Sequence, residues 1–469
     1  MKNSYDAIII GAGPAGLACS AELANKGLEV ALLDEQATPG GQIYRNITRT
    51  SSRQRTVLGE DYTEGLKVIE NFEKAAPDYL PRARVWQAEP NGEVFLSHNK
   101  SSKKLTAQFL VLSTGAMERP VPFPGWTLPG VMTCGGMSNL FKDSSLAPTE
   151  PVVIAGSGPL LWLVAEHLFA LDAPIAAILD TTPSKQYITS ARHMPQALGR
   201  FGYLMKGVKM IAAVQLAAKK AKVPMYRNVK NIEAVGNEQL QSVKATCGNK
   251  QLEFAASTLL VHEGIIPNTA LLRQIGCEHT WNPVQRYWHP EVNEHGATNL
   301  PAVFVAGDGT FVHGAKSAEY KGRLTAMAIA KQLHRLSKCE YKQQAAPVRE
   351  QLHKELQPRP FIDALYAPRK DLFAIPDEAT VCRCEGVTAG RIREIVAQGF
   401  SDHNEIKSII RCGMGPCQGR MCGSAVLELV AERSGIPAEE TRPLRMRPPI
   451  KPVSLQELAN AQLEETDES

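Results

Sequence analysis

The sequence predicts an α/β protein with two successive βαβ units, followed by a small helical unit rich in cysteine. Two observations carry this prediction. A glycine-rich turn between a short apolar strand and a helix occurs twice, at residues 11–16 and 156–161, and five of the ten cysteines lie between Cys382 and Cys422. At 469 residues, with 43% apolar and 21% charged side chains, the chain is long enough for two to four folded domains.

The first βαβ unit has the pattern of a Rossmann-like dinucleotide site. Asp6–Ile10 predicts a buried parallel strand, Leu17–Lys26 a helix and Leu28–Leu33 a second strand. Three glycines separate the first strand from the helix. The first allows the turn, the second lets backbone N–H groups approach a pyrophosphate, and the third permits close packing of helix and strand.

An acidic side chain ends the second strand, where this unit places a carboxylate for a ribose hydroxyl. Strand, turn, helix, strand and acid in register make a ligand-free turn the less favoured interpretation. The motif alone does not separate FAD from NAD. The predicted cofactor-binding residues of this unit are Gly11, Gly13, Pro14, Ala15, Gly16, Asp34 and Glu35.

Three later stretches favour FAD because they resemble parts of the two-dinucleotide-binding flavoproteins. Pro39–Gln42 resembles the glycine pair that lies along the flavin side of the cofactor, and Thr114-Gly115 resembles the turn that crosses to a second domain. Gly307-Asp308 ends a further buried strand. The resemblance implies that Asp308 accepts a hydrogen bond from a ribityl hydroxyl and that the helix from Ala315 starts towards the flavin ring. It adds Gly40, Gly41, Gln42, Thr114, Gly115, Gly307, Asp308 and Ala315 to the predicted site.

The second βαβ unit departs from the nucleotide pattern. Its turn reads Gly156-Ser-Gly-Pro-Leu-Leu161, so Leu161 stands where the third glycine belongs, and its second strand ends at Asp180. A leucine there is expected to push the helix away from the strand and to narrow the room for a pyrophosphate. Two interpretations stay open: a site for NAD or ATP, or a Rossmann-like half that persists as a scaffold.

The cysteine-rich unit has a pair of cysteines at each end of a predicted helical hairpin. Cys382-Arg-Cys384 precedes it and Cys417-Gln-Gly-Arg-Met-Cys422 follows it. Four thiolates suit either tetrahedral zinc or a 2Fe-2S cluster. Zinc knuckles usually have C-x2-C to C-x4-C spacing in both halves, and Cys-Arg-Cys is tighter than that.

The C-x-C and C-x4-C arrangement resembles the bacterioferritin-associated ferredoxin-like module, which carries a 2Fe-2S cluster. By that resemblance the cluster ligands are Cys382, Cys384, Cys417 and Cys422, and Cys412 is a bystander. We expect the Cys412 side chain to point into the hairpin as a small apolar group, although the spacing also allows Cys412 to replace Cys417 as a ligand.

Charge and hydropathy narrow the function classes. The chain carries 52 basic and 48 acidic residues, a net charge of +4 without a dense basic block, so we expect no nucleic-acid partner. No apolar run reaches the length of a membrane span, and the first strand begins too early for a signal peptide. We expect a cytoplasmic protein, with peripheral association with the inner membrane as the alternative.

Taken together, the motifs resemble the large FAD subunit of the heteromeric amine dehydrogenases over nearly the full length of the chain. That family includes opine oxidases, hydrogen cyanide synthase, and the D-hydroxyproline and dye-linked proline dehydrogenases. The matching stretches are residues 11–16, 40–42, 114–120, 156–160, 307–309, 417–422 and 447–452.

The resemblance implies an electron-transfer oxidoreductase subunit that contains FAD and a 2Fe-2S cluster and serves CH-NH or CH-NH2 donors. It implies a smaller FAD-dependent subunit that oxidises the C–N bond, in some assemblies a small ferredoxin-like third subunit, and in some an FMN between subunits. The electron acceptor implied is a quinone or respiratory carrier. No general base can be named from the sequence, so the catalytic residues are unknown.

Two other functions remain open at the sequence level. A self-sufficient NAD(P)H-dependent reductase would pass electrons from nicotinamide through FAD to the cluster, and Leu161 argues against it. A redox-sensing binding protein would hold both cofactors without electron transfer. The domains expected are an FAD domain at residues 1–125 and 285–340, a second Rossmann-like domain at 126–284, a linker at 341–377, a ferredoxin-like domain at 378–440 and an extended tail at 441–469. The proline-rich tail is expected to lie on the partner subunit.

Overall fold

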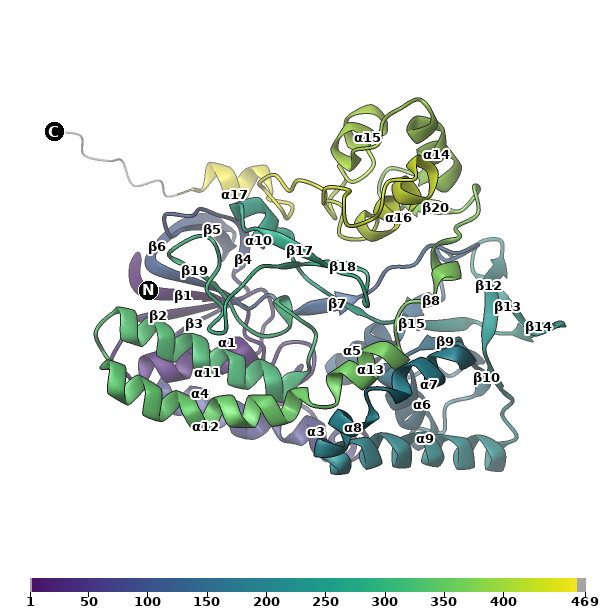
Figure 1. Cartoon of the computed structure of the whole chain (residues 1–469), viewed down its shortest axis with the longest axis horizontal. Helices are drawn as coiled ribbons and strands as arrows, with labels where there is room; N and C mark the ends of the chain where they lie inside the picture. Colours follow the sequence, from purple (N-terminus) through teal and green to yellow (C-terminus); the bar gives the residue numbers. More distant parts are fainter. Residues whose placement is uncertain (1, 462–469) are drawn as a thin grey trace.

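The computed structural model describes residues 2–461. Figure 1 shows a body of two α/β domains and a separate lobe that carries α14, α15 and α16. We call these parts the first domain, the second domain and the cysteine domain. The two α/β domains and the small helical lobe confirm the predicted fold class.

A seven-stranded sheet forms the centre of the first domain, in the order β3-β2-β1-β6-β5-β4 with β19 beside β6. Strands β1, β2, β3 and β19 are parallel to their neighbours, whereas β4 and β5 form an antiparallel meander with β6. The carboxyl ends of the parallel strands therefore meet at one edge. The strands are β1 (Ser4–Ile10), β2 (Val30–Asp34), β3 (Asp78–Pro81), β4 (Arg84–Ala88), β5 (Glu93–His98), β6 (Ser101–Leu112) and β19 (Val303–Val305).

Helices cover one face of this sheet, and Figure 1 shows α1, α4, α11 and α12 stacked on that side. Apolar side chains of α1, α4, α11 and α12 share one hydrophobic core with alternate residues of β1 and β2. The helices of this face are α1 (Pro14–Ala24), α2 (Ser52–Leu58), α3 (Glu60–Thr63), α4 (Gly65–Ala75), α11 (Ala315–Gln332) and α12 (Lys338–Leu356). The opposite face packs against α10 (Ala270–Ile275) and against the C-terminal segment.

The second domain contains a five-stranded parallel sheet in the order β11-β10-β9-β15-β8 and an antiparallel meander of β12, β13 and β14. Its strands are β8 (Val131–Thr133), β9 (Val152–Ser157), β10 (Ile175–Asp180), β11 (Met225–Arg227), β12 (Val229–Gly236), β13 (Leu240–Cys247), β14 (Lys250–Ala255) and β15 (Thr258–Glu263). Its helices are α5 (Cys134–Ser144), α6 (Pro159–Ala170), α7 (Ser184–Ala191), α8 (Met194–Ala197) and α9 (Phe201–Ala221), with a 3-10 turn, η1 (Leu198–Arg200).

The chain crosses between these two domains in a pair of short strands. β7 (Ala116–Glu118) leaves the first domain and β16 (Ile265–Pro267) returns to it, and the two strands pair antiparallel. β7 follows the Thr114-Gly115 turn that the sequence marks as a crossing, and β16 follows a turn at Gly264. A hairpin of β17 (His279–Asn282) and β18 (Tyr287–Pro290) comes after the return.

The cysteine domain is built around α14 (Ala389–Ala397), α15 (His403–Ile410) and α16 (Gly423–Ser434), with a short pair of strands, β20 (Thr380–Cys382) and β21 (Val387–Thr388). Thr388 caps α14, and Asp402 with Glu405 forms the capping box of α15, so the predicted helical hairpin is present. Isoleucine, valine and alanine side chains from all three helices form its core together with three cysteines.

The stretch expected as a linker is largely helical. α12 begins at a Ser337–Glu340 capping box and runs to Leu356, and α13 (Arg359–Leu365) and the 3-10 turn η3 (Lys370–Phe373) follow. This capping box is the local sequence signal for the start of α12. The prediction of a linker did not take it into account.

The C-terminal segment, residues 442–461, packs on this chain, and the expected contact of its exposed side chains with a partner subunit stays a prediction. We call it the strap. Leu444, Met446 and Ile450 are buried in the core on the second face of the first domain, and α17 (Leu455–Ala459) follows. Apolar side chains at these three positions explain why a proline-rich stretch finds a fixed place on the sheet. The last part of the predicted tail, residues 462–469, lies outside the described residues.

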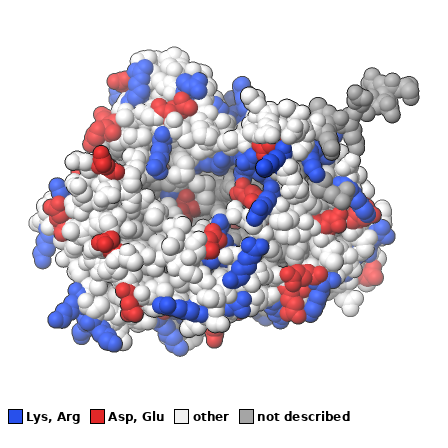
Figure 2. All heavy atoms as spheres, turned by 180° about the vertical axis from the view of Figure 1, so that it is seen from behind, with Lys and Arg blue, Asp and Glu red and all other residues white. Residues whose placement is uncertain are grey.

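The surface carries charges of both signs. Figure 2 shows Lys and Arg interspersed with Asp and Glu over one face, which is hollowed near its middle. Among the described helices, none combines the length and the apolar character needed to cross a bilayer.

Candidate functional site

The predicted nucleotide loop lies between β1 and α1 at the carboxyl edge of the first sheet. Gly11 has φ +109°, and a Cβ there would collide with the carbonyl oxygen of Ser113. A Cβ on Gly16 would collide with the carbonyl oxygen of Gly11. Both glycines are therefore required by packing, as the sequence predicts.

Gly13 differs from these two glycines because nothing in the protein crowds it. The nearest atom to a Cβ built there is the Cα of Gly41, 3.9 Å away. Gly13 is the N-cap of α1, no side chain caps that helix end, and Pro14 is its first residue. The open approach to uncapped N–H groups fits an anionic ligand such as a pyrophosphate at this helix N-terminus.

The second glycine pair lies directly on this loop. Gly40 N–H donates to the Ala12 carbonyl at 2.8 Å. A Cβ on Gly41, where φ is +62°, would lie 2.8 Å from the Cα of Gly13. The neighbouring Gln42 accepts a hydrogen bond from Asn139 through its side chain and from Lys142 through its carbonyl. The structure thus brings two stretches 27 residues apart, Gly13 and Gly40, into one cradle.

Asp34 stabilises the glycine-rich loop by accepting backbone hydrogen bonds. Its two carboxylate oxygens accept backbone N–H groups, from Ala12 at 2.5 Å and from Gln36 at 2.6 Å. The side chain is buried, and burial raises the pKa of Asp34 although both N–H groups act in the opposite direction. Glu35, one residue later, is exposed and pairs with Lys451 of the strap.

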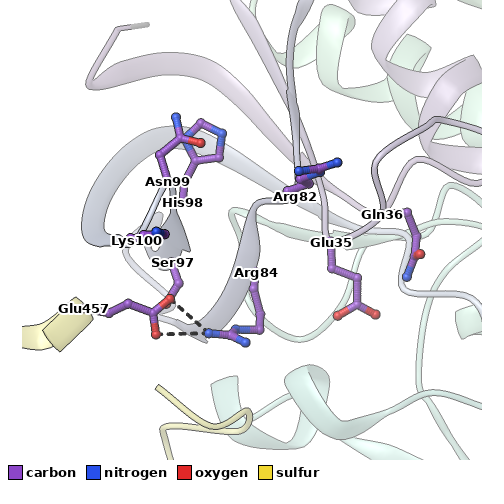
Figure 3. Close-up of a pocket in the computed structure, with 9 residues that line it drawn as sticks. All are labelled: Glu35, Gln36, Arg82, Arg84, Ser97, His98, Asn99, Lys100 and Glu457. Carbon is purple, nitrogen blue, oxygen red and sulfur yellow. Dashed lines mark hydrogen bonds and ion pairs between the residues drawn. The ribbon is translucent and has the colours of Figure 1, made fainter. Parts of the chain in front are cut away.

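A cleft of about 370 Å³ opens beside Glu35, at the end of β2 and along β4 and β5. Figure 3 shows Glu35, Gln36 and Arg82 on one side and the β5–β6 turn on the other. Arg84 donates to both carboxylate oxygens of Glu457 in the strap at 3.1 Å, so the strap closes one end. Sequence reasoning found no role for Arg82, in the connection between β3 and β4, or for Arg84, in β4, because neither lies in a recognisable motif.

The remaining predicted residues complete the same edge of the sheet. The Thr114 hydroxyl donates to the Asn268 carbonyl, and Asn268 N–H donates to the Gly115 carbonyl. A Cβ on Gly307 would lie 2.7 Å from the Cβ of Ala15, which places this strand end against α1.

Asp308 lies between β19 and α11, at the same edge of the sheet. It accepts the N–H groups of His313 and Gly314, the residues just before α11, and Ala315 is the first residue of that helix. A glycine of α11, Gly322, comes so close to α1 that a Cβ would collide with the Ala15 carbonyl. The predicted site residues therefore surround one edge rather than being scattered over the molecule.

Lys321 is a buried amine in this region that the sequence did not single out. Its Nζ donates to the Thr310 hydroxyl at 2.9 Å and to the Phe311 carbonyl at 3.4 Å. Burial lowers the pKa of Lys321 to about 8, and the charge of Asp308 only partly offsets this. The amine therefore changes its protonation close to neutral pH.

The corresponding edge of the second domain is occupied by the protein itself. A Cβ on Gly156 would collide with the His262 carbonyl, just as one on Gly11 would collide with the Ser113 carbonyl, so this contact is common to both loops. Gly158 corresponds to Gly13 but is crowded, because a Cβ there would lie 3.0 Å from the His262 ring. The Nδ1 atom of that ring is hydrogen-bonded to the Oε1 atom of Glu118 at 2.7 Å. Leu161, in the position of the third glycine, is fully buried in the core under α6.

The segment after α12 covers this edge further. α13 packs against α7, and Gln186 of α7 donates to the Ala367 carbonyl at 2.7 Å. Arg369 donates to the Val229 carbonyl and lies 3.8 Å from Glu263, at the end of β15. At the end of β10, Asp180 accepts the Thr182 N–H and is buried.

All five clustered cysteines meet at one end of the cysteine domain. The sulfur atoms of Cys382, Cys412 and Cys422 lie within 4.8 Å of one another, and all three residues are buried. Hydrogen bonds from Cys412 and then Cys422 lower the pKa of the Cys382 thiol to about 2. Cys384 and Cys417 interact with each other as a second pair at the same end.

The predicted four ligands are thus brought together, but Cys412 lies with them. The expectation that the Cys412 side chain points away from the other sulfur atoms is wrong for this structure, whereas its role as a bystander that does not bind the cluster stays a prediction. Cys412-x4-Cys417 repeats the spacing of Cys417-x4-Cys422, so spacing alone could not reveal which pair is used. Five soft sulfur donors within one end of a small domain suit an iron–sulfur cluster.

Glycines shape the loop that holds these cysteines. A Cβ on Gly415 would collide with the Cβ of Cys384. Gly413 and Gly419 both have positive φ, and a Cβ on either would come within 3.0 Å of Leu444 in the strap. The loop, the first cysteine pair and the strap are therefore closely packed.

The cysteine domain is attached to both α/β domains. Arg286, in the β17–β18 hairpin, donates to both carboxylate oxygens of Glu428 in α16, at 2.7 and 2.5 Å. Trp126, on the crossing to the second domain, donates to the Thr380 carbonyl at 2.6 Å. A bidentate arginine–carboxylate pair with a largely buried partner fixes orientation as well as position.

Two family matches cover most of the chain. Residues 5–332 match the pyridine nucleotide-disulphide oxidoreductase family. Residues 380–432 match the BFD-like [2Fe-2S] binding domain. Together with the open glycine cradle and the gathered cysteines, these matches identify FAD and a 2Fe-2S cluster as the cofactors.

Curated relatives are similar over almost the whole chain. An opine oxidase subunit of Rhizobium meliloti is 38% identical over 98% of this chain and 88% of its own length. The corresponding opine oxidase subunit of Agrobacterium tumefaciens is 39% identical over 98% of this chain and 92% of its own length. Hydrogen cyanide synthase subunit HcnB of Pseudomonas aeruginosa is 30% identical over 97% of this chain and 98% of its own length.

A solved structure shares the fold. The L-proline dehydrogenase of P. horikoshii superposes with a TM-score of 0.69, at 21% identity, over 97% of this chain and 79% of that one. The family matches and the curated relatives agree with the geometry of both sites. This chain therefore belongs to the family of these opine oxidase and hydrogen cyanide synthase subunits, and it combines a pyridine nucleotide-disulphide oxidoreductase region with a BFD-like 2Fe-2S domain.

Proposed function

We propose that this chain is the electron-transferring FAD and 2Fe-2S subunit of a heteromeric amino acid or opine dehydrogenase. A smaller partner subunit oxidises the C–N bond, and this chain carries the electrons away to a respiratory acceptor. The observation that carries the proposal is the combination of an open first nucleotide cradle, a docked cysteine domain and a second nucleotide edge that the protein fills itself.

In this proposal the residues of the first domain bind and orient FAD. Gly13 leaves the approach to the α1 N-terminus open for the pyrophosphate. Asp34 is committed to two backbone N–H groups, so we assign the ribose contact to Glu35, whose carboxylate faces the cleft. Asp308 and the start of α11 at Ala315 remain the proposed contacts for the flavin half.

Cys382, Cys384, Cys417 and Cys422 are the proposed cluster ligands. The cluster supplies one-electron transfer, and the protein supplies the thiolates and a shielded position between the helical hairpin and the strap. The gathering of the five sulfur atoms supports a cluster at this end, while the choice among them rests on the family spacing.

The self-sufficient reductase is disfavoured by the second domain. Its loop at Gly156–Gly158 packs on His262, and Arg369 crosses the end of the sheet where a nicotinamide nucleotide would lie. A disulfide reductase is disfavoured too: before Cys382 the described cysteines stand singly, without a pair close in sequence.

Stopped-flow mixing of the oxidised protein with NADH and with NADPH tests the assignment. We expect no fast bleaching of the flavin by either nucleotide. The substrate-oxidising partner with its amino acid or opine should instead reduce both the flavin and the cluster. Fast bleaching by NADH or NADPH would refute the relay function.

A second test uses the chain without its partner. It should show no dehydrogenase activity towards proline, hydroxyproline, glycine or an opine, with an artificial dye as acceptor. Full turnover by the lone chain would contradict the proposed division of labour. The same preparation should show flavin absorbance and a 2Fe-2S signal, which controls for loss of the cofactors.

A further inference from the structure

A partly open pocket lies at the junction of the first domain and the cysteine domain. One wall is formed by β16, α10 and the β17–β18 hairpin. The other is formed by the loop between α15 and α16, residues 411–422, which we call the cysteine loop, and by the start of α16. Leu444 and Met446 of the strap line it as well. We call it the junction pocket. Its volume of about 70 Å³ suits a group of four or five heavy atoms, not a nucleotide.

Four buried side-chain atoms on residues that line this pocket have no hydrogen-bond partner among the described residues. They are the Nε of Arg273, the Nε1 of Trp288, the Nε2 of His403 and the Oγ of Ser424. The His403 residue is only 3% exposed. Buried polar atoms are nearly always paired, so four unpaired donors around one cavity indicate a missing acceptor.

The charge around the junction pocket has one sign. Arg273, Arg286 and Arg420 line it, and none of the described lining residues is Asp or Glu. Arg286 is neutralised by Glu428 and Arg420 donates to the Ile450 carbonyl, but the Arg273 side chain makes no hydrogen bond or ion pair within residues 2–461. Burial lowers the pKa of Arg273 to about 10, which still leaves it charged at neutral pH. A buried, uncompensated cation is costly.

The N-terminus of α16 points into the same region. Gly423 and Ser424, its first two residues, line the pocket, and no side chain caps this helix end. The positive end of the helix dipole therefore adds to the charge of Arg273. Water could accept some of the hydrogen bonds, but it would leave the guanidinium charge uncompensated.

We propose that the junction pocket binds a small oxyanion, either free phosphate or sulfate or a small carboxylate. The oxyanion would accept hydrogen bonds from Arg273, His403 and Ser424 and neutralise the Arg273 charge. The site lies beside the cysteine loop rather than in the nucleotide cradle, so it is separate from the proposed FAD site and does not rest on the identity of the substrate.

Isothermal titration of the full chain, loaded with FAD and cluster and freed of phosphate and carboxylate buffers, tests the proposal. We expect one phosphate or sulfate per chain at millimolar concentrations or below. Arg273→Gln should weaken binding by roughly tenfold or more, because it removes a charge-assisted hydrogen bond. Arg335→Gln is the matched control, since Arg335 is exposed on the first domain and does not line the pocket; it should bind as the wild type does.

A second variant protects the test against misfolding. His403→Phe removes one donor but keeps the Arg273 charge, so its binding should be weaker than wild type and stronger than that of Arg273→Gln. Unchanged flavin absorbance and cluster resonance show that each variant is folded. Parallel titrations with phosphate and with acetate separate the two sources of oxyanion, and binding of either supports the site.

Absence of heat for phosphate, sulfate and acetate alike would overturn the proposal. So would wild-type affinity in Arg273→Gln. A cluster resonance that changes in Arg273→Gln while no oxyanion binds to the wild type would show that Arg273 instead compensates the charge of the cluster, and would also overturn it.

Discussion

Replacing Leu444 by alanine should weaken the first domain and the cysteine domain together. Leu444 is 2% exposed and belongs to the core on the second face of the first sheet. Its Cδ2 also lies against Gly413 and Gly419 of the cysteine loop. One side chain of the strap therefore packs into both domains.

The size of the effect follows from burial. Removing a fully buried leucine side chain costs about 2–5 kcal/mol, the sum of lost transfer free energy and the cavity left behind. We expect about 3 kcal/mol, because the two glycines offer no side chain that could fill the cavity. For a cooperative domain of this size that lowers the unfolding midpoint by roughly 6–12 °C.

The assay is a thermal ramp that follows flavin fluorescence for FAD release and visible absorbance for loss of the cluster. Both midpoints should fall in Leu444→Ala. Leu455→Ala is the control, because Leu455 lies in the same strap but is 85% exposed, and its change should stay within about 0.5 kcal/mol of zero. Equal midpoints for the two variants, or a shift in only one signal, would refute the idea that Leu444 joins the domains.

Three further predictions concern the cofactors and the buried lysine. Gly13→Val should fold but lose FAD, because only the ligand approaches this position; full yellow colour after purification would contradict the assignment. Cys417→Ser should abolish the electron paramagnetic resonance signal of the dithionite-reduced cluster while Cys412→Ser keeps it, and the reverse result would exchange their roles. The unfolded chain holds the Lys321 proton up to pH 10.5 and the folded chain only to about 8, so between these values the unfolded state binds more protons and stability rises with pH. Urea unfolding should show wild type gaining up to about 1.4 kcal/mol per pH unit over Lys321→Met in that window, and a constant difference would rule this out.

Local signals were readable in the sequence because they act over a few residues. The glycine loop at Gly11–Gly16 and the capping box at Asp402 predict the elements they begin, and both elements are present. Spacing also brought the two cysteine pairs together correctly. In each case the chemistry is set by neighbours in the chain.

Contacts between distant residues could not be predicted in this way. The Glu35–Lys451 pair joins residues 416 positions apart, and the Arg84–Glu457 pair joins residues 373 positions apart. No local pattern marks either one, so nothing in the sequence placed the strap on its own chain. The same reason explains why Arg369 was not expected over the second nucleotide edge.

The direction of side chains was the second feature that could not be predicted from the sequence. Spacing showed that Asp34 ends β2, but not that two backbone N–H groups already hold its carboxylate. Likewise, three cysteines at equal intervals do not reveal that Cys412 faces Cys382 and Cys422. Side-chain direction depends on how the loop closes, which tertiary packing decides.

The strap has a consequence for how the protein is made. The glycine loop at residues 11–16 leaves the ribosome long before the strap, so the core on the second face of its sheet lacks Leu444 and Ile450 until the cysteine domain has also been synthesised. The Ile450 N–H donates a hydrogen bond to the Trp86 carbonyl in β4, and the Arg420 side chain of the cysteine loop donates one to the Ile450 carbonyl. Nascent chains should therefore expose an unfinished apolar face late into translation, when chaperones are needed most. A ribosome that stalls or terminates before residue 444 should release a product that aggregates, even though both nucleotide-binding units are already complete.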